Sequence, residues 1–212
     1  AMGISINEYL VSVYIWSVYT ECLHGMPSKC PIRVAVPVNL RPYFNSITTK
    51  NFFVMVSAEF HPTKETYTFA EVAAIVKESL RSQINRENLE KLFSYNVSNE
   101  KLLIARVVPL FLKNLAMKYV YTTSALANTA TITNIGNISV TEEYRPYVEM
   151  FHAFLAMSKG QHLKGTICSY GDTLVFSFSY DLVDASVQRG FFRKIASDGI
   201  AVEIKSNGVN YE

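Results

Sequence analysis

The chain has 212 residues, of which 49% are hydrophobic and 18% are charged, so it can bury the core of a globular domain. Its formal net charge is +2 and its basic residues are scattered, which argues against a nucleic-acid-binding or anionic-membrane-binding surface. The three cysteines show no Cys-x-x-Cys spacing, which predicts free thiols in a reducing compartment, the cytoplasm, and no structural zinc.

The ends of the chain and its hydropathy bear on domain organisation. The most apolar run, residues 10–19, is too short to cross a bilayer and lacks the features of a signal peptide, so we expect no membrane span. Ala1 and Met2 look like the remnant of an expression tag. We therefore expect residues 1–212 to form a single domain that was cut from a longer polypeptide.

The first predicted element is a helix over residues 6–23. Ser5 and Glu8 have the spacing of a capping box, in which each residue binds the backbone amide of the other. Apolar side chains lie on almost all sides of this helix, so we expect it to be buried against more than one neighbour. Gly25 and Pro27 are typical helix-ending residues.

A buried strand that stops at a proline-bounded corner is predicted within residues 31–44. Its β-branched residues favour an extended backbone, and Pro42 keeps Arg41 extended as well. Such a strand end holds a side chain still, so Arg41, beside Asn39, would present a planar set of donors to an anion. The neighbouring sequence offers no obvious anion.

The middle of the chain predicts a strand and then helices. Strict alternation over residues 52–60 predicts a strand, and because both of its faces are partly apolar we expect it to be central in its sheet. Thr68 and Glu71 form a second capping box that opens a helix reaching toward Leu92. Helical pattern continues over residues 102–108, and Pro109 is expected to begin a further helix over residues 110–119.

In the last third of the chain, several segments alternate between two faces as strands do. Residues 163–170 and 173–180 should form a tight hairpin around Gly171 and Asp172. Asp184 is suited to cap a final helix that has an apolar stripe. Further strands are expected over residues 128–137, 148–157 and 201–204. The order of elements predicts an α/β domain: an open mixed β-sheet with helices packed on it in two layers.

Three segments, taken in order, resemble the second half of the chloramphenicol-acetyltransferase-like superfamily. This superfamily includes alcohol acetyltransferases and the condensation domains of peptide synthetases. The segments are Val36-Pro37-Val38-Asn39-Leu40-Arg41-Pro42, Thr133-Asn134-Ile135-Gly136-Asn137, and Tyr180-Asp181 followed by a helix with Phe191-Phe192. The resemblance covers nearly the whole chain and implies the C-terminal lobe of a two-lobe, coenzyme A-dependent acyltransferase.

The resemblance also implies an activity, together with a part that this chain lacks. In the superfamily, the first lobe carries a His-His-x-x-x-Asp-Gly motif whose second histidine takes a proton from an alcohol or amine, which then attacks an acyl thioester. None of the four histidines of this chain completes that motif. We therefore expect the base to lie in a missing N-terminal lobe, acyl-coenzyme A to be the co-substrate, and no cofactor to be bound covalently.

The superfamily suggests roles for four residues. Arg41, beside Asn39, matches an arginine that pairs with the aspartate of the histidine motif and so registers the lobes; alternatively, it is solvated or binds local carbonyls. Asn134 and Gly136 match a stretch that lines the substrate channel, where an amide can steady a thioester or a developing oxyanion. The alternative is that these two residues are ordinary turn formers.

Other candidate residues favour structural roles. We expect His152 to be a structural histidine within a strand and His61 to be a loop residue. Asp181 is expected at a strand end, and Cys168 should be a buried thiol with no base to activate it.

Two functions from different classes therefore remain open. The chain is either the lobe of an acyltransferase that supplies channel wall and lobe registration, or a non-catalytic binding or assembly module that kept the fold. An isolated lobe would also expose apolar surface, so we expect self-association through that face.

Overall fold

The computed structural model describes residues 3–101, 108–158 and 160–207. The first helix, α1 (Ile6–Ser17), has the predicted capping box: the Ser5 hydroxyl accepts from the Glu8 amide, and the Glu8 carboxylate accepts from the Ser5 amide. The helix continues as a π-helical turn over Val18–Cys22, and the chain then turns through His24 and Gly25, which both have positive φ. The proposed tag remnant lies outside the described residues.

Five strands form one mixed sheet in the order β2-β1-β3-β4-β5. The pairs β1–β2 and β4–β5 are antiparallel, whereas β1, β3 and β4 run parallel, as an open mixed sheet requires. The predicted hairpin of β4 and β5 is confirmed. The strands are β1 (Ile32–Asn39), β2 (Phe53–Phe60), β3 (Ala130–Asn137), β4 (Leu163–Tyr170) and β5 (Thr173–Tyr180).

The predicted central position of β2 is wrong, because β2 is an edge strand. Its second apolar face is not covered: Phe53 and Met55 are about half exposed. The outer backbone edge of β2 is instead protected by side chains of α2 (Phe69–Gln83). Ser79 accepts from the Glu59 amide, and Gln83 binds both the amide and the carbonyl of Ser57.

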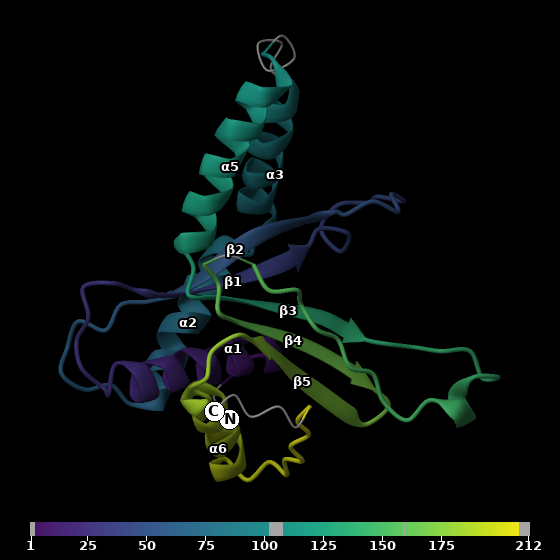
Figure 1. Cartoon of the computed structure of the whole chain (residues 1–212). Helices are drawn as coiled ribbons and strands as arrows, with labels where there is room; N and C mark the ends of the chain where they lie inside the picture. The colour runs from purple at the N-terminus through teal and green to yellow at the C-terminus, as the bar shows by residue number, and fades with distance from the viewer. Residues whose placement is uncertain (1–2, 102–107, 159, 208–212) are drawn as a thin grey trace.

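Three helices cover one face of the sheet. Figure 1 shows α1, α2 and α6 (Ser186–Ser197) together on this side, with α1 packed against both other helices as its nearly all-round apolar pattern predicts. α2 begins at the predicted Thr68–Glu71 capping box. Asp184 accepts from the backbone amide and the hydroxyl of Ser186, the first residue of α6. The N-cap residue is Ala185, which has no capping side chain, so Asp184 binds the start of the helix from one position before the cap.

Two helices stand on the opposite side of the sheet from this layer. The helix predicted to reach Leu92 is interrupted at Ile84, and α3 (Arg86–Lys101) begins after Asn85, whose side chain accepts from the Asn88 amide. Pro109 precedes α5 (Leu110–Leu126), as predicted, although α5 is longer than expected. The predicted helical stretch at 102–108 lies almost wholly outside the described residues. Figure 1 shows α3 and α5 projecting from the body as an arm.

Two predicted strands do not form. Residues 148–157 run across β4 as an irregular strap, held by side chains instead of by backbone pairing. The Lys164 ammonium donates to the carbonyl of Ala156 and to the hydroxyl of Ser158, and the Cys168 thiol donates to the carbonyl of Phe151. Residues 201–204 are likewise irregular.

Candidate functional site

The strand order reverses between β1 and β3, which lie side by side in the middle of the sheet. β2 lies on the outer side of β1, whereas β4 and β5 lie on the outer side of β3. The gap between β1 and β3 is therefore the topological switch point of the sheet. The ladder between β1 and β3 pairs only Val34 with Ala130 and Ala35 with Thr131, and beyond these residues the two strands diverge (Figure 1). In open α/β sheets, ligands bind outside the carboxyl ends of parallel strands at such a switch point.

Arg41 lies at the carboxyl end of β1, and its guanidinium folds back over its own loop. It donates to the carbonyls of Thr48 and Lys50 at 3.1 and 2.9 Å and to the Asn39 side chain at 3.4 Å. The Asn39 oxygen also accepts from the Arg41 amide, so the predicted neighbours are brought together. Among residues 3–101, 108–158 and 160–207, no carboxylate lies within ion-pair distance of Arg41.

Asn134 and Gly136 lie at the carboxyl end of β3, on the other side of the switch point. The ladder with β4 slips by one residue here, so that Ile135 bulges out of register. Gly136 has φ 86°, a left-handed conformation that favours glycine, and its amide donates to the Asn134 side-chain oxygen at 2.8 Å. This bond holds the side-chain oxygen of Asn134, which is exposed, and so fixes the direction in which its NH₂ group points.

A pocket of about 470 Å³ follows Gly136 along the chain, and no sequence motif indicated it. Its lining includes Asn137, Arg145 and Tyr170, and the buried Tyr170 hydroxyl has no hydrogen-bond partner among the described residues. Arg145 pairs with Glu142 at 3.0 Å, and both side chains are largely exposed. The pocket forms where the chain leaves β3 and later crosses β4, so no local sequence pattern could have revealed it.

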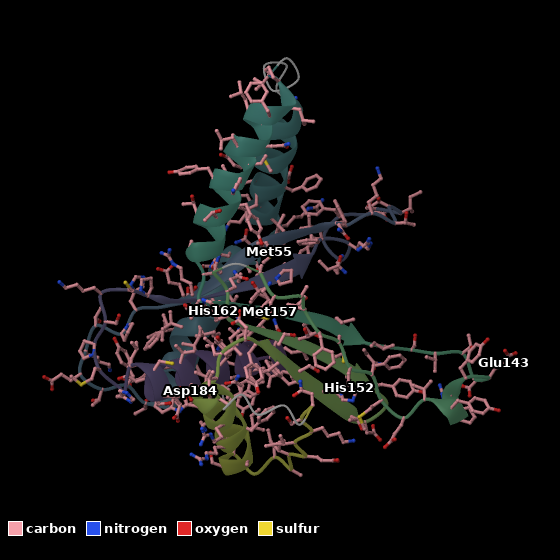
Figure 2. The ribbon with its side chains drawn as sticks, viewed as in Figure 1. Met55, Glu143, His152, Met157, His162 and Asp184 are labelled. Carbon is pink, nitrogen blue, oxygen red and sulfur yellow. The ribbon has the colours of Figure 1, made fainter. Side chains whose placement is uncertain are left out.

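None of the four histidines forms a catalytic group with these residues. His61 pairs with Glu59 at the carboxyl end of β2, and His162 Nδ1 donates to the Asp181 carboxylate at 2.9 Å at the start of β4. Both positions lie near the amino ends of the parallel strands, at the opposite end of the sheet from the switch-point residues. His152 is exposed on the strap and stacks on Phe154, so its predicted place within a strand is wrong (Figure 2).

The clearest carboxylate–guanidinium pair of the sheet is also away from the switch point. Arg33, near the start of β1, donates to Glu59 at 2.9 Å, and this bond, with a further one from His61, lowers the pKa of Glu59. Cys168 is buried, as predicted, and burial raises the pKa of its thiol. Within the described ranges, no group of acidic residues, histidines and cysteines is arranged to hold a metal ion, and no helix is long and apolar enough to cross a membrane.

No protein-family model and no curated protein sequence matches the chain. Solved structures do match. Over 91% of its length the chain is similar to the epimerization domain from the third module of tyrocidine synthetase B, with a TM-score of 0.51 and 10% identity, and it covers 41% of that domain structure. A condensation domain from the enacyloxin polyketide synthase gives a TM-score of 0.44 and 11% identity, with 98% and 39% of the two chains covered.

The first of these matches shows the fold of the chain and does not show its chemistry. The α/β class with an open mixed sheet is confirmed, and the chain shares its fold with part of that epimerization domain. The chain spans about two fifths of the solved structures that it resembles.

Proposed function

We propose that this chain is the C-terminal, channel-forming lobe of an acyltransferase that moves an acyl group from a thioester, acyl-coenzyme A in the first instance, to an alcohol or amine. The observation that carries the proposal is positional. Asn39 ends β1 and Arg41 follows it by two residues, while Asn134 and Gly136 lie at the carboxyl end of β3, so both pairs lie at the carboxyl ends of the two parallel strands that flank the switch point. This is the place where a sheet of this topology binds its ligand.

Asn134 is suited to stabilise negative charge on the thioester oxygen. Its oxygen is held by the Gly136 amide, so its NH₂ group is oriented before any substrate arrives. A donor fixed in advance in this way lowers an acyl-transfer barrier, because no reorganisation is needed as charge develops. The pocket beyond Gly136 provides room for part of a substrate, and the Tyr170 hydroxyl beside it has no hydrogen-bond partner within the described part of the chain.

Arg41 is suited to a second role, in lobe registration. Its present acceptors are neutral carbonyls of an exposed loop, and a carboxylate is a stronger partner for a guanidinium. An aspartate presented by another lobe can therefore replace Thr48 and Lys50 as the partner of Arg41. The general base must come from that lobe too, because the histidines of this chain do not gather at the switch point.

The test is an acyl-transfer assay on the polypeptide that includes the sequence encoded upstream of Gly3. Acetyl-coenzyme A is offered with a panel of alcohols and amines, and the released thiol is titrated. We expect release by the longer polypeptide and none by residues 1–212 alone. If the upstream sequence carries no His-His-x-x-x-Asp-Gly motif and neither protein releases thiol, the chain is the non-catalytic module and the proposal fails.

A further inference from the structure

The loop that carries Arg41 is fastened to the base of α3. This loop, residues 40–52, connects β1 to β2, and from residue 45 onward it contains no helix or strand. A backbone bond from the Leu40 amide to the Phe52 carbonyl closes the loop at its base. A segment with little regular structure opens easily unless side-chain contacts hold it, so the contacts of this loop decide how well Arg41 is fixed.

α3 contacts the loop near both of its ends. The first residue of α3, Arg86, has its guanidinium over the ring of Phe44, 5.7 Å from the ring centre. Two helical turns later, the ring of Phe93 meets the ring of Phe52 edge to face, with 5.3 Å between the ring centres and 84° between the ring planes. Both arrangements are attractive, the first between a cation and an aromatic ring and the second between two aromatic rings.

The part of α3 that makes these contacts is itself seated on the domain. Arg86, Leu89 and Phe93 follow one another at spacings of three and four residues, so they share one face of the helix. Leu89, which lies between the two loop contacts, is completely buried in the core. α3 also contacts β2, from which it rises in Figure 1. The loop is therefore held by a helix whose base is fixed in place.

The two contacts bracket the segment that holds the Arg41 side chain. The guanidinium of Arg41 donates to the carbonyls of Thr48 and Lys50, so its direction depends on where this part of the loop lies. Phe44 follows Arg41 by three residues, and Phe52 follows Lys50 by two. Fixing the two rings therefore fixes both the residue that donates and the segment that accepts.

We propose that α3 is the positioning element of Arg41: Phe93 and Arg86 hold the loop so that the guanidinium stays at the end of β1 until the carboxylate of another lobe meets it. That encounter rests on the proposed function, whereas the hold of α3 on Arg41 does not depend on it. A loop that is ordered in advance loses less conformational freedom on binding, which strengthens the pairing. Phe93 and Arg86 act through Arg41 and need not touch a substrate.

NMR relaxation of the arginine Nε–H groups measures this hold in residues 1–212, and the Arg41 signal is the one that Arg41→Lys removes. We expect an order parameter near the level of rigid backbone, about 0.85, in the wild type and below about 0.6 in Phe93→Ala and Arg86→Ala. Phe93→Tyr keeps the aromatic ring and should keep the wild-type value. Tyr95→Ala is the matched control and should change nothing, because Tyr95 is 68% exposed and lies two residues on, on the opposite side of α3 from Phe93.

Far-UV circular dichroism shows that each variant is folded. A mobile Arg41 in either alanine variant, beside an ordered one in Phe93→Tyr and Tyr95→Ala, supports the proposal. An Arg41 signal that is already mobile in the wild type overturns it, and so does equal order in the wild type and both folded alanine variants. Turnover of the longer polypeptide is a separate outcome: without acyl transfer the proposed function fails, while the relaxation data still decide whether α3 positions Arg41.

Discussion

Replacing Gly165 with alanine should destabilise the sheet by steric overlap. Gly165 lies in the middle of β4, and a Cβ atom built there comes within 2.7 Å of Phe176 Cζ and 3.2 Å of Ile132 Cγ1. The Phe176 ring has little freedom to move away, because the rings of Phe178 and Phe191 lie 4.7 and 4.4 Å from it. Overpacking of a well-packed core costs on the order of 2 kcal/mol.

For a chain of this length, that cost lowers the midpoint of thermal unfolding by roughly 4–8 °C. The measurement is thermal unfolding followed by far-UV circular dichroism. Gly190→Ala is the matched control: its Cβ also meets a neighbour, at 2.9 Å, but that neighbour is the flexible side chain of Glu21. Alanine is the better helix former inside α6, so this variant should be neutral or stabilised. Equal destabilisation of both variants would refute the packing argument.

Three further predictions concern charged and reactive groups. Arg81→Ala should lower the unfolding midpoint by less than Gly165→Ala does. Arg81 lowers the pKa of Glu8 from 4.5, so this ion pair stabilises the fold at neutral pH and ceases to do so as the pH falls through the lowered pKa. The Arg81→Ala variant should therefore lose stability in acid less steeply than the wild type. Iodoacetamide should modify the two exposed cysteines of the folded protein and reach Cys168 only after unfolding, as mass spectrometry can show; rapid native labelling of Cys168 would contradict its burial. His152→Ala and His162→Ala should each keep acyl-transfer activity in the longer polypeptide, and loss of turnover in either would place the base within this chain.

Local signals in the sequence predicted the elements whose structure depends on nearby residues. The Ser5–Glu8 and Thr68–Glu71 capping boxes both form, because each involves residues only three positions apart. The turn at Gly171 and the alternation on either side of it were sufficient to predict the β4–β5 hairpin. The start of α3 was missed, although Asn85 is a capping residue and marks it.

Features that depend on distant segments could not be predicted in the same way. β2 was expected at the centre of the sheet because both faces are apolar, yet nothing local reveals that α2 side chains, not another strand, cover its edge. The strap at 148–157 alternates like a strand, but its carbonyls bind Lys164 and Cys168, which lie on β4. Side-chain bonds of this kind leave no period in the sequence.

The candidate site was predictable in part. The motifs placed Asn39 with Arg41 and Asn134 with Gly136, and the structure shows both pairs in contact. That the two pairs flank one switch point follows from strand order, which no motif contains. The acceptors of Arg41 in its own loop agree with the alternative of local carbonyl binding, and its pairing with another lobe stays a prediction.

Turnover of the longer polypeptide carrying Asn134→Ala is the most direct test of the central claim, which is that the switch point between β1 and β3 is where acyl transfer takes place. Loss of one preorganised donor to a developing oxyanion lowers kcat by roughly a hundredfold. We expect a loss of that order for Asn134→Ala, with little change for Asn45→Ala, an exposed asparagine in the loop after β1. Equal turnover of the wild type and the Asn134→Ala variant would contradict the account.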